Sequence, residues 1–265
     1  MFTLQDDVFC VSKNQSHLKR ETLLKASSPH VLIERRKVWA SKPIIRRLYR
    51  KWYGLIEKTL RPGRTLELGG GSGVVKEFLP EVITTDIVFA HWLDAVMDAH
   101  ALPFKEESME NIVLFDVLHH LAAPAVFFGE VERVLRPKGR LVIMEPYVSM
   151  LSFPIYLFLH AEGMDWCADP FEGKPNSRKE PFKGNQAIPK LIFEKHRKRF
   201  SECFPHLKMV LEEKMDSFLY PLSGGFHHPS LCPMFAWNAV ERLEGILRRV
   251  NKYIAFRIFV VLEKG

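Results

Sequence analysis

Long apolar runs are missing from this sequence. The longest ones, such as FPIYLFLHA from Phe153, fall well short of the ~20 residues that a membrane-spanning helix needs. The N-terminus has acidic side chains where a secretory signal peptide has basic ones, and no long apolar core follows them. We therefore expect a cytoplasmic protein.

Cysteine is scarce, and its spacing argues against a disulfide framework. No C-x-x-C pair is present, and the four cysteines lie far apart, at Cys10, Cys167, Cys203 and Cys232. This pattern indicates reduced thiols. The hydrophobic share of 47% is ordinary for a globular protein, so 265 residues can bury a full core.

Acidic side chains are few at the N-terminal end. Residues 1–62 carry 14 Lys and Arg against 5 Asp and Glu, whereas the rest of the chain carries 24 against 26. The net charge of +7 therefore comes from the N-terminal segment. The excess fits either a solvated helix face or a surface for an anionic partner, such as a membrane, a phosphorylated substrate or nucleic acid.

Short apolar runs alternate with helical patterns in the first half of the chain. We predict strands at 65–68, 82–87, 95–99, 111–117 and 140–146, with helices at 44–60, 74–80 and 124–139. This alternation with short loops predicts parallel strands joined by right-handed crossovers. Residues 1–40 are expected to be loosely ordered, and 41–265 to form one domain.

The second half has a looser pattern. We predict a helix at 188–204, strands at 207–215 and 256–264, and an amphipathic helix at 234–254. The apolar side of that last helix is expected to pack in the core; it carries Phe235, Val240, Leu243, Ile246, Leu247 and Val250.

The stretch TLELGGGSGVV (65–75) contains the densest run of glycines. Glycines between a buried strand and a helix let backbone N–H groups approach a ligand, although a tight turn without a ligand would also use them. The stretch lacks the Lys-Ser/Thr of a P-loop, and Val74 replaces the third glycine of a dinucleotide fingerprint. What is present is an acid followed by alternating glycines: Glu67, Gly69, Gly71 and Gly73.

This pattern resembles the first motif of class I S-adenosylmethionine (SAM) dependent methyltransferases. DAHALPF (98–104), LFDVLHHL (114–121) and ERVLRPKGRLVI (132–143) follow in the family's order. By pattern, the sequence looks most like the ubiquinone/menaquinone-type small-molecule methyltransferases. The resemblance implies a Rossmann-like α/β sheet, mostly parallel with the last strand antiparallel. The motif core would be residues 64–146. The N-terminal helix and two insertions, 147–187 and 218–255, would cover its substrate side.

The resemblance also implies a set of SAM-binding residues. Asp86 would accept hydrogen bonds from the ribose, and Asp98 with the following N–H would face the adenine. The full cofactor set is Glu67, Gly69, Gly71, Gly73, Asp86, Asp98, Ala99 and Phe115. Only eleven residues separate Asp86 from Asp98, a departure from the family that predicts a turn in place of a helix. Trp92 there would be either an adenine wall or a core residue.

Catalysis is not assigned to a residue, because methyl transfer needs a base only if the acceptor arrives protonated. His119 and His120 follow the fourth strand and are candidates, although either ring could simply pack its turn. The helix at 44–60 is a candidate lid, with Tyr49, Trp52 or Tyr53 reaching inward.

The aromatic and Met content of the insertions predicts a small, apolar or aromatic acceptor. There are two alternatives: a SAM-binding partner subunit without transfer activity, and an RNA methyltransferase that uses the basic N-terminal helix. A DNA N-methylase is not expected, because EPY (145–147) follows the fifth strand, whereas the related motif of those enzymes follows the fourth. Nucleic acid is thus not the partner that we expect first. An anionic membrane surface is a possible partner.

No metal is expected from the sequence. Two polar groups were weighed as ligands, namely His227, His228 and Cys232, and a second group of His160, Glu162, Asp165 and Cys167. Neither has the spacing of a closed structural zinc site.

Overall fold

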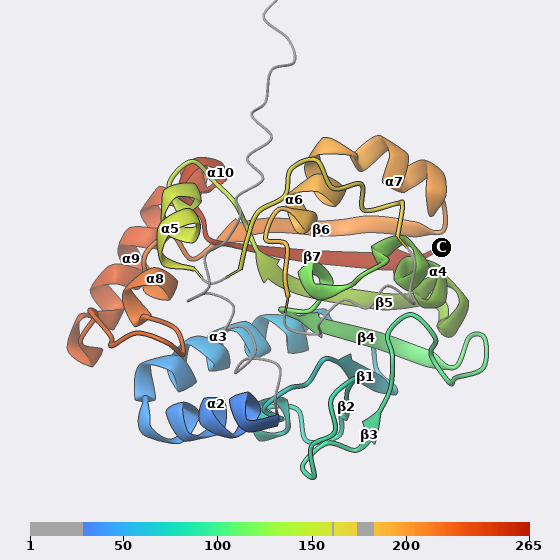
Figure 1. The fold of residues 1–265 in the computed structure, drawn as a ribbon, viewed down its shortest axis with the longest axis horizontal. Coiled ribbons are helices and arrows are strands. Elements are labelled where there is room, and N and C mark those ends of the chain that lie inside the picture. The colour runs from blue at the N-terminus through green and yellow to red at the C-terminus, as the bar shows by residue number, and fades with distance from the viewer. Residues whose placement is uncertain (1–28, 161, 174–182) are drawn as a thin grey trace, which may run out of the picture.

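A computed structural model describes residues 29–160, 162–173 and 183–265. Its centre is one seven-stranded sheet with the order β3-β2-β1-β4-β5-β7-β6 (Figure 1). The strands are β1 Thr65–Leu68, β2 Ile83–Asp86, β3 Ala95–Val96, β4 Met109–Phe115, β5 Leu135–Pro146, β6 Leu207–Met215 and β7 Arg257–Lys264. The strand order changes direction at β1, because β2 and β3 lie on one side of it and β4 lies on the other. Ligands of such sheets bind at this switch point, beyond the carboxyl ends of the strands, here β1 and β4.

The pairing confirms the predicted α/β sheet. β1 pairs in parallel with β2 and β4, and β4 pairs in parallel with β5. β7 is antiparallel to both β5 and β6. The sheet is therefore mostly parallel with an antiparallel last strand, as the sequence predicts.

The helices agree with the sequence in some places and differ in others. They are α2 Pro29–Ser41, α3 Pro43–Thr59, α4 Pro124–Val134, α5 Ser152–Leu159, α6 Ile188–Lys190, α7 Arg197–Cys203, α8 Leu219–Ser223, α9 Trp237–Leu247 and α10 Asn251–Ile254. A π-helical turn, Leu191–Lys195, lies between α6 and α7. The helix predicted at 74–80 is only a 3-10 turn, Val74–Glu77.

Three predictions about these elements were wrong. Residues 29–40 were expected to be loose but belong to α2, which buries Leu32 and Trp39; the rest of that segment, 1–28, lies outside the described residues. Residues 135–139 were assigned to a helix but begin β5, because α4 ends at Val134. The helix predicted over 234–254 is broken into α9, α10 and two 3-10 turns.

Each face of the sheet is covered by a separate hydrophobic cluster. Because side chains alternate along a strand, Ile112 and Leu114 of β4 pack with the α4 and α7 side, whereas Val113 packs with α3. Phe127 and Phe128 of α4 are almost completely buried. On the other face of the sheet, helix α3 begins at Pro43. A proline suits the first turn of a helix, because the N–H that it lacks would have no partner within the helix there.

Helix α3 is joined to the second insertion by a buried ion cluster. Asp216 accepts hydrogen bonds from Nζ of Lys51 at 2.7 Å and from Nε1 of Trp52 at 2.5 Å. Glu244 of α9 lies 3.5 Å from the same Lys51 ammonium. The side chain of Asp216 is fully buried, so this charge depends on its partners.

The predicted core face of α9 is largely exposed. Phe235 is 89% exposed and Ile246 is 78% exposed. The side chains that α9 and α10 bury are instead Trp237, Glu244 and Asn251. In the described part of the chain, no helix is both long enough and apolar enough to cross a membrane.

Candidate cofactor and acceptor site

The glycine loop after β1 is held by the end of β2. The backbone N–H of Gly70 donates to the carbonyl of Thr85 at 2.8 Å. The N–H of Gly71 donates to Oδ2 of Asp86 at 2.9 Å, and Val88 N–H donates to Oδ1. Burial raises the pKa of Asp86, against the lowering effect of these hydrogen bonds. Two residues of the predicted cofactor set therefore touch directly.

The three motif glycines are needed for different reasons. A Cβ on Gly69 would lie 2.2 Å from a methyl group of Val117, and one on Gly73 would lie 2.6 Å from Trp92. A Cβ on Gly71 would meet nothing closer than 3.6 Å, where Leu32 lies. Gly69 and Gly73 thus serve packing, while a Cβ on Gly71 would make only ordinary contacts, one of them with Asp86 at 4.0 Å.

Glu67 is a buried acid that lacks a full set of partners. Its side chain is 2% exposed, and Oε1 accepts a hydrogen bond from the Tyr53 hydroxyl at 3.2 Å. Oε2 has no hydrogen-bond partner. Burial raises the pKa of Glu67 to about 8; the Tyr53 bond opposes this, and the charge of Asp86 adds to it. The site can therefore accept a positively charged group.

Asp98 and Phe115 border the same region from two other strands. Met97 N–H donates to the carbonyl of Asp86, which places Asp98 directly beyond that strand end. Asp98 is paired with His100, at 2.7 Å, and Ala99 is buried. Phe115 ends β4 and stacks on Tyr49 of α3 at 5.0 Å.

Helix α2 covers the glycine loop. Nη1 of Arg36 donates to the carbonyl of Ser72 at 2.8 Å, and its guanidinium lies 4.7 Å from the Trp92 ring. Nε1 of Trp92 donates to the carbonyl of Gly71 at 2.9 Å. Trp92 is therefore part of the loop's cover. The sequence had pointed to the helix at 44–60 as the lid; α3 contributes Tyr53 from within, but the covering contacts come from α2.

Asp116 and Arg257 were missed in the sequence. Asp116 follows β4 directly and has a positive φ of 57°. Nη1 of Arg257 lies 2.6 Å from its Oδ1, and the guanidinium is near the rings of Trp52, Phe115 and Tyr220. Arg257 is 1% exposed. A basic residue at the start of an otherwise apolar strand was the signal that could have found it.

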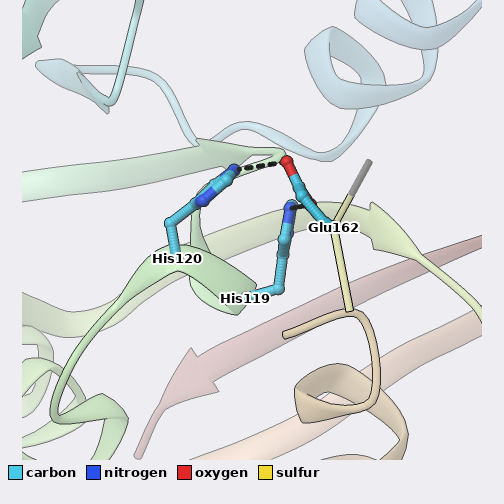
Figure 2. Close-up of side chains that lie close together, drawn as sticks. All are labelled: His119, His120 and Glu162. Atoms are coloured by element: carbon cyan, nitrogen blue, oxygen red, sulfur yellow. Dashed lines mark ion pairs between the residues drawn. The ribbon is translucent and has the colours of Figure 1, made fainter. Parts of the chain in front are cut away.

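The two candidate histidines lie next to Glu162, a residue that no sequence pattern groups with them (Figure 2). His119 and His120 belong to a 3-10 turn after β4, Leu118–His120. Nε2 of His119 lies 3.1 Å from Oε2 of Glu162, and Nε2 of His120 lies 3.5 Å from Oε1. On its other side, Nδ1 of His119 lies 2.5 Å from Oε2 of Glu145.

The charge on this cluster is set by the buried imidazole. Burial by itself lowers the pKa of His119, but the charges of Glu145 and Glu162 outweigh this effect and raise the pKa to about 10. Burial raises the pKa of Glu162, yet His119 and then His120 hold it well below its usual range. Without a bound ion, the two carboxylates therefore favour the protonated form of His119, and an ion at Nε2 would take the place of that proton.

The two groups of polar residues named from the sequence do not form a set of possible metal ligands in the described structure, as the expectation of no metal at either of them implied. Within residues 29–160, 162–173 and 183–265, the residues that could share an ion are His119, His120 and Glu162. Glu162 belongs to the second of the two polar groups named from the sequence, whereas His119 and His120 belong to neither group. No disulfide joins Cys167, Cys203 and Cys232, and Cys10 lies outside the described residues.

Comparison with known proteins agrees with this geometry. Residues 66–143 match the family described as Methyltransferase domain. A SAM-dependent methyltransferase from Archaeoglobus fulgidus has a similar fold, with a TM-score of 0.51 and 14% identity over 83% of this chain and 94% of that one. A Thermotoga maritima protein, titled a SAM-dependent methyltransferase and possible histamine N-methyltransferase, gives a TM-score of 0.49 and 14% identity over 94% and 98%.

A short curated match exists as well. A 49-residue stretch is 47% identical to an uncharacterised 37.1 kDa protein in transposon TN4556 of Streptomyces fradiae; it spans 18% of this chain and only 14% of that protein. The sheet is therefore similar to that of a solved SAM-dependent methyltransferase, and residues 66–143 are similar to the methyltransferase-domain family.

Proposed function

We propose that this enzyme binds SAM at the glycine loop and transfers its methyl group to a small, apolar or aromatic acceptor. The observation that carries the cofactor assignment is the unpartnered Oε2 of Glu67. A buried carboxylate without a partner is costly, and a bound ammonium group relieves that cost. SAM carries such a group on its methionine part.

The other residues suit the remaining parts of the same ligand. Asp86 has lone pairs left for ribose hydroxyls after its two backbone hydrogen bonds. Gly71 leaves room for close approach of the backbone. Asp98 and the N–H of Ala99 lie beyond the end of β2, where the family resemblance would put the adenine.

When bound, SAM supplies a methyl group that its sulfonium already activates, so the chain's residues act mainly by positioning. Leu32 lies beside Gly71, Trp92 donates to the Gly71 carbonyl, and Tyr53 donates to Glu67, so these side chains would hold the loop and the acid in place. Asp116 and the histidines follow β4, at the edge of the sheet where an acceptor would bind.

The insertions favour an apolar acceptor that arrives from an anionic lipid surface. Leu151 N–H donates to the Tyr253 carbonyl, so α5 and α10 are neighbours, and Figure 1 shows α9 beside them at one end of the molecule. In α5, in α9 and in the residues just before each of them, six apolar side chains are at least 67% exposed: Met150, Phe158, Leu159, Leu231, Phe235 and Ile246. We call this set the apolar patch. Exposed basic residues lie among them, at Arg242, Arg248, Arg249 and Lys252, which suits anionic headgroups.

The test begins with calorimetry of SAM and its demethylated product. We expect both to bind to the wild type and SAM to bind more weakly to Glu67→Gln, with Glu81→Gln as an exposed control. Labelled methyl transfer is then measured with phenolic and quinol lipids. Absence of SAM binding would contradict the proposal. Binding with no transfer to any of these lipids would favour the partner-subunit alternative, and salt-dependent RNA binding the RNA alternative.

A further inference from the structure

Two adjacent histidines and one glutamate present their side chains to a common point (Figure 2). His119 and His120 come from the turn after β4, and Glu162 comes from the segment after α5. Their ligand atoms lie within 4.8 Å of one another. We propose that His119, His120 and Glu162 bind a divalent transition-metal ion.

The spacing of the cluster suits coordination. Ligand atoms of a tetrahedral ion at about 2.1 Å lie about 3.4 Å from one another. The two imidazole Nε2 atoms lie 3.1 Å and 3.5 Å from the two oxygens of Glu162. Only small side-chain movements are needed to bring the three groups around one ion.

A buried carboxylate orients the first histidine. Glu145 is fully buried, and its Oε1 accepts hydrogen bonds from Val117 N–H and Leu118 N–H, both at 2.7 Å. Its Oε2 lies 2.5 Å from Nδ1 of His119. A hydrogen bond at Nδ1 fixes the ring and leaves Nε2 for the ion, which is the carboxylate–histidine–metal arrangement of many metal sites.

The glutamate is positioned as well. Nε2 of Gln186, itself 1% exposed, donates to Oε2 of Glu162. The N–H of Asn185 donates to the carbonyl of His119 at 2.9 Å. The loop before α6 therefore holds the glutamate against the turn that carries the histidines, so all three ligands sit on fixed backbone.

The ligand types select the class of ion. Imidazole nitrogens favour Zn²⁺, Fe²⁺ and similar ions, whereas Mg²⁺ and Ca²⁺ prefer oxygen ligands. Three protein ligands leave a fourth position open. If the proposed function holds, an acceptor hydroxyl would take that position, lose its proton to water and be methylated as the more reactive oxyanion. This role rests on the proposed function, but the binding of the ion does not.

The experiment uses the full chain after removal of metal by a chelator. We expect one Co²⁺ to bind per chain, with visible absorption bands, and Zn²⁺ to displace it. Glu162→Gln and His120→Ala should abolish the bands, while His206→Ala, an exposed histidine away from the cluster, should keep them. Glu145→Gln should weaken Co²⁺ binding about 10–100-fold through loss of orientation.

Thermal melts establish that each variant is folded. Absence of Co²⁺ binding to the wild type, or equal binding by folded Glu162→Gln and His120→Ala, would overturn the proposal and leave an ordinary ion-pair cluster. SAM binding is measured on the same metal-free protein. Co²⁺ binding without SAM binding would refute the proposed function but keep the metal site; the reverse result would refute the metal site alone.

Discussion

The carboxylate of Asp86 accepts a hydrogen bond from the backbone N–H of Gly71, with 2.9 Å between Oδ2 and the nitrogen. An acid at the end of β2 thereby fixes the loop after β1. This contact ties together two parts of the predicted cofactor site that lie 15 residues apart in the sequence, and it leaves Asp86 with capacity for a further donor.

Asp86→Ala is expected to weaken SAM binding by about 1.5–3 kcal/mol, because hydrogen bonds to a charged group are lost. Calorimetry measures this change. Asp94→Ala is the matched control, since Asp94 holds the neighbouring turn through Thr84 N–H and Lys76. Equal SAM affinity in wild type and Asp86→Ala would show that Asp86 only holds its loop.

The raised pKa of Glu67 predicts a pH dependence. In the absence of ligand, the folded state binds more protons than the unfolded state between pH 4.5 and about 8. Stability from this group is therefore greatest below pH 4.5 and falls as the pH rises toward 8, by at most about 1.4 kcal/mol per pH unit. Glu67→Gln should reduce that slope in denaturant titrations.

SAM binding should show the opposite trend at the same group. A bound ammonium favours the ionised form, so affinity should rise from pH 6 to pH 8 and binding should release a proton. Calorimetry in buffers of different ionisation enthalpy measures the release. If the pH dependence of SAM affinity is unchanged in Glu67→Gln, the cofactor's ammonium lies elsewhere.

Arg36→Ala is expected to weaken SAM binding by about 0.5–1 kcal/mol, the usual size of an exposed cation–π contact. The substitution removes the contacts of the Arg36 guanidinium with Ser72 and Trp92, which hold α2 over the glycine loop. Lys37→Ala is the control, because the ammonium of Lys37 pairs with Glu34 of its own helix. SAM should also slow tryptic cleavage within α2; cleavage at the same rate with and without SAM would argue against a cover.

The apolar patch predicts binding to anionic vesicles. The double variant Phe158→Ser, Ile246→Ser should lose at least tenfold in affinity for phosphatidylglycerol vesicles, since each buried side chain contributes about 2 kcal/mol. Val210→Ser, at a half-exposed site on β6, is the control. Sedimentation with vesicles measures the loss. Equal sedimentation of wild type and double variant, or none of the wild type, would contradict docking through this patch.

Much of the fold was readable from the sequence because its signals are local. The apolar strands, Pro43 at the start of α3 and the glycines after β1 each act within a few residues, so alternation and motif order predicted the parallel sheet. The same local reading failed for α9. The apolar side predicted there, with Phe235 and Ile246, has the period of a core helix, but among the described residues no other element covers these two side chains. Periodicity does not say what a face packs against.

The sequence by itself determined the sheet, and it predicts the cofactor motif from Glu67 to Asp86. Tertiary structure alone decided what those residues meet: that Oε2 of Glu67 has no partner, that α2 covers Gly71, and that Glu162 joins His119. Such contacts join positions that are distant along the chain, so they depend on how the loops after β4 and α5 return to the edge of the sheet. No pattern within a short stretch of sequence contains that path, since it is fixed by packing of the whole domain.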